Sequence, residues 1–400
     1  MRANRSRRSL LKGAAAAAVT MPMINFGRFQ VFAGVPEYSA QTLDVMGEST
    51  VIDMLGLIRL DFNDEVWPNK LSGPRREDFQ ASGITALHHA SGIGGPDAYE
   101  QALQYFAGWN GFIARNSDLF SLVDTADDVS AAKAAGKVAV IMGVQNAEHF
   151  RSADDVTAFW DLGQRSAQLT YNSQNRLGAG STERVDGGLS DFGLEVVAKM
   201  NEVGMLVDVS HCGDRTTVDA IEASDKPIAV THSNARALNN HPRLKTDEAI
   251  RKLAAKGGVM GITGVRNFVR DREPTTVEHV VDHIDHVAHL TAIEHVGIGS
   301  DADLYGYDAL PAEAQQRLRE NYKASYAFRD KIDTDGFDHP RKFFDLTEAL
   351  LRRGYSGEQV RAVLGGNFQR LLDEVWSANR AFEQARKKQA EKETASEAPN

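Results

Sequence analysis

Cysteine is nearly absent from this 400-residue chain, which contains Cys212 and no other. A single cysteine excludes an internal disulfide framework and a zinc site built from cysteine pairs. Positive charge is also scarce, because 45 Lys and Arg residues face 55 Asp and Glu residues and the formal net charge is −10. An acidic chain of this kind argues against nucleic acid and against an anionic membrane surface as binding partners.

The first residues resemble an export signal and not the start of a folded domain. The stretch "SRRSLLKG" places Arg7 and Arg8 ahead of two leucines and a lysine, and a short Ala-rich apolar stretch follows. This pattern resembles the twin-arginine signals of bacteria, and the apolar stretch is too short for a stable transmembrane span. We therefore expect residues 1–33 to be a signal peptide that engages the twin-arginine export machinery and directs the protein to the periplasm. Folding in the reducing cytoplasm before export agrees with the lack of disulfides.

Short apolar segments alternate with amphipathic stretches from about residue 45 onward. Turn signals such as "AAGK", "EVGM" and "AAKGG" precede several of the apolar segments, which predicts strands. Stretches such as Asp214–Ala223 and Thr246–Ala255 have the periodicity of helices. The expected strands are Val51–Leu57, Ile84–His88, Val138–Val144, Ser166–Tyr171, Met205–Ser210, Ile228–Thr231, Gly258–Thr263 and Val296–Ser300.

Eight near-continuous apolar strands joined by helices predict an α/β fold of the (β/α)8 TIM-barrel type. An open doubly wound sheet is the alternative, but the chain has no Gly-rich dinucleotide motif and no P-loop to favour it. We expect the barrel domain to span residues 34–378, with long insertions at Arg59–Phe79 and Asn172–Phe192. Residues 379–400 are charged and lack apolar anchors, which predicts a disordered tail or a frayed helix.

Two of the expected strands end in a histidine. His211 follows "MLVDVS", and His232 follows "IAVT". Active sites of (β/α)8 barrels lie at the carboxyl ends of the strands, so these imidazoles should meet there with Asp301, which ends the last expected strand. Two histidines and one aspartate satisfy the three-ligand rule for a catalytic Zn²⁺. The sequence therefore predicts a metal site.

Longer stretches carry a resemblance to a known family. The segment "GMLVDVSHCGDRTTVDAIEASDKPIAVTHSNARALNNHPR", together with "LTYNSQNRLGAGSTERVDGGLSDFG" and "HVGIGSDAD", resembles the membrane (renal) dipeptidase family of metallopeptidases. This resemblance implies a (β/α)8 TIM barrel of the metallo-dependent hydrolase type, with a two-zinc centre that cleaves dipeptides. It leaves open whether the protein forms a homodimer. It further implies that His211 and His232 bind one zinc. Arg243 would grip the substrate carboxylate, and Asp301 would assist at the metals and handle protons.

Several positions depart from the family pattern. Leu55 and Leu57 stand where the family has a His-x-Asp ligand pair at the end of the first strand. The bridging glutamate is matched by Gln145, which makes that position a weak ligand at best, and a substrate-side histidine is matched by Tyr171. A leucine cannot bind zinc, and a neutral glutamine cannot offset the repulsion between two dications. The resemblance therefore implies at most one zinc per chain, or none.

Other residues near the same rim are candidates to restore a lost ligand. His88 and His89 end the second expected strand, and because adjacent strand residues point to opposite sides, at most one of them reaches the centre. Glu148 and His149 lie just past Gln145. Arg243 is expected at the barrel rim, where its replacement should weaken substrate binding and leave the fold intact.

These observations support three hypotheses on function. The first is a periplasmic dipeptidase-like hydrolase that acts on a small peptidic substrate, with Asp301 and Tyr171 as catalytic residues and Arg243 and Tyr171 as substrate-binding residues. In this reading Tyr171 donates a hydrogen bond to the developing oxyanion. The second is a dipeptidase-like protein reused for another maturation step on an exported peptidic metabolite, such as a siderophore. The third is a non-catalytic peptide-binding protein.

Overall fold

The computed structural model describes residues 38–60 and 70–397, and side chains as far as residue 388. The barrel belongs to one compact unit, Ala40–Asn400. The expected signal peptide, residues 1–33, lies outside the described residues. Among the described residues, no helix is both long and apolar enough to cross a membrane.

Nine strands form within the described residues, and every pairing between them is parallel. They are β1 (Ile52–Asp53), β2 (Ala86–Ser91), β3 (Phe120–Leu122), β4 (Val138–Val144), β5 (Gln164–Gln168), β6 (Leu206–Asp208), β7 (Ala229–Ser233), β8 (Val259–Ile262) and β9 (Val296–Ile298). Pairing of β2 with β4 closes the sheet, so that eight strands, all except β3, form a barrel. The predicted (β/α)8 barrel is confirmed, and each of the eight expected segments contains or overlaps one barrel strand.

The ninth strand, β3, shares one edge of β4 with β5. β3 pairs with residues 138–140 of β4, and β5 pairs with residues 142–144, after a register shift between Met142 and Gly143. One strand edge is therefore divided between two partners. The sequence analysis did not predict β3, because its three residues become progressively more exposed along the strand and carry no sustained apolar run.

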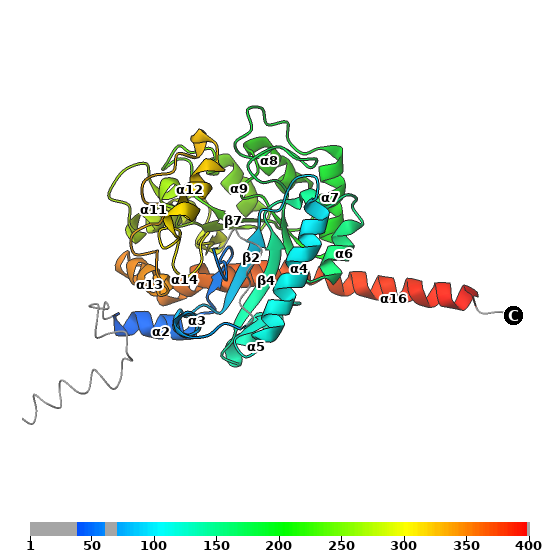
Figure 1. The fold of residues 1–400 in the computed structure, drawn as a ribbon, viewed down its shortest axis with the longest axis horizontal. Coiled ribbons are helices and arrows are strands. Elements are labelled where there is room, and N and C mark those ends of the chain that lie inside the picture. Colours follow the sequence, from blue (N-terminus) through cyan, green and yellow to red (C-terminus); the bar gives the residue numbers. More distant parts are fainter. Residues whose placement is uncertain (1–37, 61–69, 398–400) are drawn as a thin grey trace, which may run out of the picture. The chain divides into compact units, whose positions relative to one another are not determined.

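Helices surround the barrel (Figure 1). Those described are α2 (Ala40–Glu48), α3 (Pro74–Ala81), α4 (Ala98–Arg115), α5 (Ala126–Ala134), α6 (Asp155–Asp161), α7 (Asp191–Val203), α8 (Asp214–Ala223), α9 (Asp247–Ala255), α10 (Arg266–Val269), α11 (Val277–Leu290), α12 (Ala312–Glu320), α13 (Lys342–Arg352), α14 (Gly357–Arg361), α15 (Asn367–Trp376) and α16 (Ala378–Glu397). α8 has the predicted bounds. α9 begins one residue later than predicted, because Thr246 is its N-cap and accepts the N–H of Ala249.

Two buried aspartates explain why β1 and β6 end earlier than their apolar runs. Asp53 accepts the N–H of Ser300 at 2.7 Å and the N–H of Leu55 at 3.4 Å. Asp208 likewise accepts the N–H groups of Ser210 and Thr231. A carboxylate thus takes backbone donors that a longer strand would offer to its neighbour, and the chain turns into the loops of the carboxyl rim.

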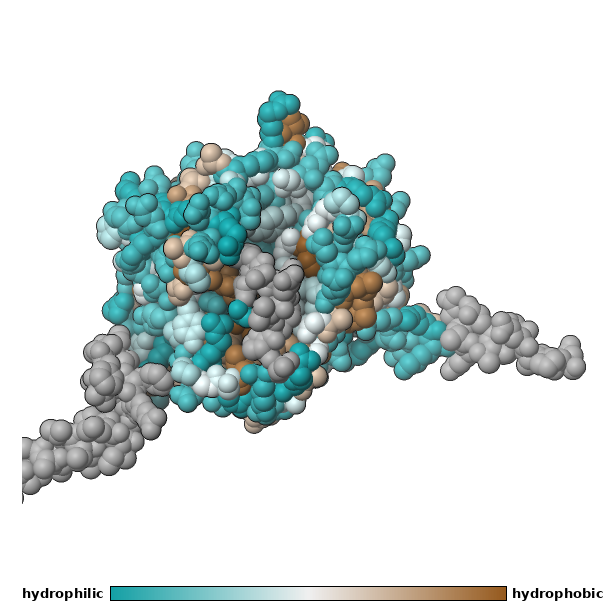
Figure 2. All heavy atoms as spheres, viewed as in Figure 1, coloured by the Kyte–Doolittle hydropathy of each residue, from teal (hydrophilic) through white to brown (hydrophobic). Residues whose placement is uncertain are grey.

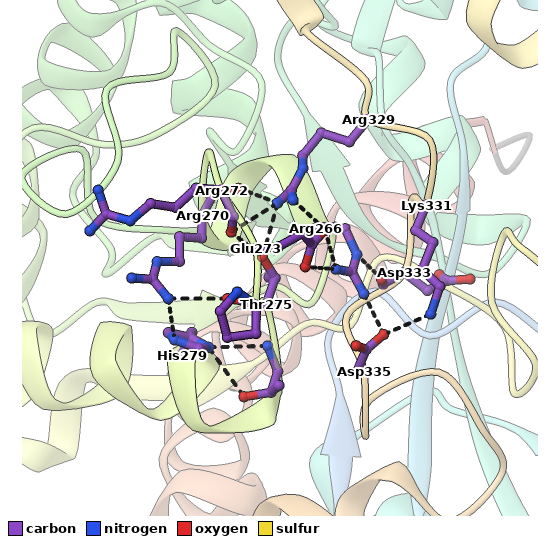
Figure 3. A network of polar contacts seen from close by, with 12 residues as sticks. Arg266, Arg270, Arg272, Glu273, Thr275, His279, Arg329, Lys331, Asp333 and Asp335 are labelled. Carbon is purple, nitrogen blue, oxygen red and sulfur yellow. Dashed lines mark hydrogen bonds and ion pairs between the residues drawn. The ribbon is translucent and has the colours of Figure 1, made fainter.

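A third insertion, residues 302–341, follows β9 and was not predicted. It contains α12, and the buried Arg266 of α10 anchors its far end (Figure 3). The Arg266 guanidinium donates to Glu273 at 2.6 and 2.7 Å, to Asp335 and to the carbonyl of Asp333 at 2.6 Å. Arg329 also binds Glu273, so one carboxylate joins the insertion to the segment after β8. This network holds the insertion over the barrel rim.

The charged C-terminal segment forms helix α16. The sequence had allowed either a disordered tail or a frayed helix here. Its first turns contact the domain: the Asn379 amide donates to the carbonyl of Val203, and Arg386 pairs with Asp161. The face shown in Figure 2 is mostly hydrophilic, and its apolar residues lie in small separate groups.

Candidate active site

The two predicted histidines meet at the carboxyl end of the barrel. His232 belongs to β7, and His211 follows β6 by three residues. Their Nε2 atoms lie 3.0 Å apart, and both side chains are almost completely buried. The structure therefore brings together two imidazoles that are 21 residues apart in the chain.

The outer nitrogens of both imidazoles are held by hydrogen bonds. His211 Nδ1 lies 2.8 Å from the side-chain oxygen of Asn172, which can only accept, so Nδ1 carries the proton. His232 Nδ1 lies 2.8 Å from the hydroxyl of Thr231. That hydroxyl donates to Asp208 at 2.7 Å, so it accepts from His232. In both rings the proton resides on Nδ1, and the two Nε2 lone pairs face each other.

The electrostatic surroundings keep this pair neutral. Burial, followed by the Arg243 guanidinium, lowers the pKa of His211 and of His232 well below the usual histidine value. Two neutral imidazoles with facing lone pairs repel each other unless a cation lies between them. Buried nitrogen donors with protonated, hydrogen-bonded Nδ1 atoms are the arrangement found in histidine metal sites. The pair therefore fits as two ligands of one metal ion.

No third ligand completes the set in the described part of the chain. Within it, no group of three or more His, Cys, Asp or Glu side chains is placed to hold an ion. Asp301, expected as the third ligand, lies in the loop after β9, where its N–H donates to the carbonyl of Leu55 at 2.8 Å. Burial raises the pKa of Asp301 to about 7, against the opposing effect of Arg243. Its carboxyl group can thus exchange a proton near neutral pH.

The candidate replacement ligands are held by contacts of their own. His88 donates from Nδ1 to the carbonyl of Met54 at 2.8 Å inside the barrel, whereas His89 packs against Trp109 with ring centroids 3.9 Å apart. The two adjacent histidines thus point to different sides, as expected for strand residues. Glu148 accepts the N–H of Gly95 at 3.0 Å. His149 is buried 3.1 Å from the side chain of Gln164.

Arg243 is more deeply buried than its predicted place at the barrel rim implied. Its side chain is fully buried, and its guanidinium donates to the carbonyl of Ser210 and, at 3.2 Å, to the carbonyl of His232. Lys245, two residues later, donates to the carbonyls of Val209 and Cys212 at 2.7 and 2.9 Å. The two cations therefore hold the backbone on both sides of His211. The expectation that Arg243 is a rim residue dispensable for folding needs correction, because its removal leaves buried carbonyls without donors.

Tyr171 separates the histidine pair from a large cavity. Its ring stacks on His211 with centroids 4.1 Å apart and an angle of 18° between the planes. The Tyr171 hydroxyl lies 2.7 Å from that of Tyr322, and both tyrosines line the cavity. Burial raises the pKa of Tyr171 well above its usual value, so the hydroxyl stays a hydrogen-bond donor.

The cavity has a volume of about 1,340 Å³. Gln145 lines it and donates to the carbonyl of Ala90 at 3.1 Å, and its own side-chain oxygen receives no hydrogen bond from the described residues. Leu57 also lines the cavity, whereas Leu55 is fully buried. The histidine pair does not line it, and neither do Arg243 and Asp301.

The chain matches the membrane dipeptidase family (Peptidase family M19) over residues 68–319 and 327–386. This protein belongs to the membrane dipeptidase family. The suspected resemblance is thereby confirmed at the level of the family, which comprises hydrolases of the metallopeptidase class. The match begins after β1, so it does not include Leu55 and Leu57.

Individual dipeptidases and a solved structure agree with this assignment. Dipeptidase verJ of Clonostachys rogersoniana is 33% identical over 267 residues, which are 66% of this chain and 62% of verJ. Dipeptidase tcpJ of Claviceps purpurea (strain 20.1) is 29% identical over 339 residues, 84% of this chain and 71% of tcpJ. The crystal structure of an amidohydrolase from Pseudomonas aeruginosa is 32% identical with a TM-score of 0.74, and covers 84% of this chain and 99% of that one. The chain thus spans less than two thirds of verJ.

Several residues of this dipeptidase-family site were not found from the sequence. Asn172 and Thr231, which fix the two imidazoles, each lie next to a residue that the sequence analysis named. A search for Nδ1 acceptors beside strand-end histidines would have found Thr231, which adjoins His232, whereas Asn172 lies 39 residues from His211. Tyr322 comes from the insertion after β9 and carries no such signal, because its place depends on how that insertion folds back.

Proposed function

We propose that this member of the membrane dipeptidase family is a hydrolase of small peptidic substrates with a reduced centre of at most one zinc ion. The observation that carries the proposal is the pair of facing Nε2 lone pairs on His211 and His232. A zinc ion held there would lower the pKa of a bound water and polarise a carbonyl. Leu55, Leu57 and the uncharged Gln145 cannot supply a second zinc with the ligands that the family resemblance implies.

The surrounding residues have separate roles in this proposal. Tyr171 and Tyr322 offer hydroxyl donors from the cavity floor toward the oxygen of a substrate carbonyl. Asp301 holds or releases a proton near neutral pH, because burial raises its pKa to about 7. Because Tyr171 covers His211, the ring has to turn aside before a substrate in the cavity reaches the histidines.

A panel of dipeptides assayed with the purified protein tests this function. We expect slow hydrolysis that depends on added zinc and is lost with a chelator, and no more than one tightly bound divalent ion per chain by elemental analysis. Two stoichiometric ions with rapid dipeptide turnover would show that another residue has rebuilt the centre. Burial of the histidine pair outside the cavity favours a second candidate, a non-catalytic peptide-binding protein. Peptide binding without hydrolysis at any zinc concentration would support that candidate.

We also propose that the protein is exported to the periplasm by the twin-arginine pathway, on the strength of Arg7, Arg8 and the apolar stretch that follows. Changing both arginines to lysine is expected to retain the precursor in the cytoplasm, because Lys lacks the guanidinium. Cell fractionation and immunoblotting measure the distribution. Periplasmic protein at the normal level in the double variant would refute the assignment, and a maturation role on an exported peptidic metabolite would lose its support.

A further inference from the structure

The cavity is larger than a dipeptide substrate requires. Pockets for small molecules usually enclose about 300–1,000 Å³, whereas this cavity encloses about 1,340 Å³. Its walls come from separate parts of the chain: α3, α4, and the insertion that carries Tyr305 and α12. A dipeptide bound above Tyr171 would leave much of this space to water.

The charge of the cavity wall is opposite to that of the chain. Four described lining residues are cationic, namely Arg59, Arg75, Arg317 and Lys323, and the only anionic one among the described residues is Asp303. The Asp303 carboxylate is already satisfied by main-chain donors, because it accepts N–H groups from Leu60, Tyr305 and Gly306 at 2.9–3.1 Å. A cationic wall in a protein with a net charge of −10 favours anionic ligands.

Two of these cations have no carboxylate partner among the described residues. The other two have partners: Lys323 pairs with Glu183 at 3.2 Å, and Arg59 also takes part in a polar or electrostatic contact. Arg75 lies over the ring of Tyr305, 5.1 Å from its centroid, and makes no ion pair with a described residue. Arg317, on α12, has neither an ion pair nor a hydrogen bond from its side chain to the described part of the chain. A guanidinium held flat on an aromatic ring keeps its edge available to a carboxylate.

We propose that the cavity selects acidic peptides longer than a dipeptide, whose carboxylates bind Arg75 and Arg317 at a distance from the histidine pair. This proposal rests on the proposed function in taking the substrate to be peptidic, and it adds the substrate's length and charge. The volume and the charge of the cavity support the same substrate class independently. The space admits additional residues, and two arginines that make no ion pair with a described residue favour acidic ones. Binding of its carboxylates to these arginines would fix one end of the peptide, and the other end would then lie above Tyr171.

Calorimetric titration of the full-length chain tests the proposal, with a chelator present so that binding is measured without turnover. The probes are the tetrapeptides Ala-Glu-Glu-Ala and Ala-Gln-Gln-Ala, which differ in charge and hardly in size, and the dipeptide Ala-Ala. We expect the Glu peptide to bind about tenfold more tightly than the Gln peptide at low salt, with a smaller ratio at high salt. The double variant Arg75→Gln/Arg317→Gln should reduce the ratio to about twofold or less. The matched control Arg251→Gln, which removes an exposed arginine of α9 outside the cavity, should keep it.

The outcomes separate this proposal from the proposed function. Equal affinity for the two tetrapeptides, with Ala-Ala hydrolysed on addition of zinc, would overturn the acidic-substrate proposal and leave the hydrolase standing. An unchanged ratio in the double variant would overturn the assignment to Arg75 and Arg317. Tighter binding of the Glu peptide without hydrolysis of any peptide would support the binding site and overturn the hydrolase.

Discussion

Replacing His211 or His232 with alanine is expected to remove both the metal ion bound at this pair and the zinc-dependent hydrolytic activity. Each variant leaves one imidazole at a centre where no third His, Cys, Asp or Glu joins the pair among the described residues. One histidine holds zinc too weakly to survive dialysis. Loss of metal assistance is worth several kcal/mol in the barrier, so we expect activity to fall on the order of 1,000-fold or more.

Elemental analysis and peptide hydrolysis measured on the same preparations test this expectation. His289→Ala is the matched control, since it removes an exposed imidazole from α11 and should change neither value. Asn172→Ala should give an intermediate result, with metal affinity reduced by about 10–100-fold, because it releases the Nδ1 hydrogen bond of His211 but leaves both imidazoles in place. Full metal content in the His211→Ala and His232→Ala variants would place the metal elsewhere and remove the basis of the proposed function.

Arg243→Met is expected to destabilise the fold by about 3–5 kcal/mol. The guanidinium is fully buried and satisfies the carbonyls of Ser210 and His232. Methionine fills part of the space but donates nothing, and each unsatisfied buried carbonyl costs about 1–3 kcal/mol. The same change removes a positive charge beside both histidines, so their pKa values should rise toward the usual range.

Urea denaturation followed by circular dichroism measures this loss, with Arg251→Met as the control for an exposed arginine. The control should remain within about 0.5 kcal/mol of the parent protein. A normal urea midpoint in Arg243→Met together with weaker peptide binding would contradict the structural role. It would return Arg243 to the substrate-anchoring role that the family resemblance implies.

The parts of the fold that were predicted follow from local patterns. A buried parallel strand favours a short apolar run, and most of the barrel strands lie in or beside one, although β5 itself is QRSAQ and has a single apolar residue. β3 was missed because it occupies only half of a strand edge, which a pattern along one segment cannot reveal. The insertion after β9 was missed for a similar reason, since Arg266 and Glu273, two partners in its anchoring network, lie in a different segment.

The candidate site, like the fold, has parts that local patterns predicted and parts that they did not. His211 and His232 were predicted to meet because strand ends of a parallel barrel share one rim, which is a rule of topology. The burial of Arg243 depends on how the loop after β7 folds back onto β6. The spacing of apolar residues in the sequence does not predict the path of that loop. The tyrosine pair above the histidines joins Tyr171 to Tyr322 across 151 positions. Contacts of that range depend on insertions, whose paths the sequence pattern does not specify.

The backbone at Asp301 restricts which residues that position accepts. Its φ of 60° lies in the left-handed region, where Asp, Asn and Gly are comfortable and a residue with an ordinary side chain loses about 1–2 kcal/mol. An alanine there would therefore change the rim geometry and the carboxyl group together, whereas asparagine keeps the turn and removes only the titratable proton. The backbone at the exit of the last strand thus limits this position to Asp, Asn or Gly, whether or not its carboxyl group takes part in the chemistry.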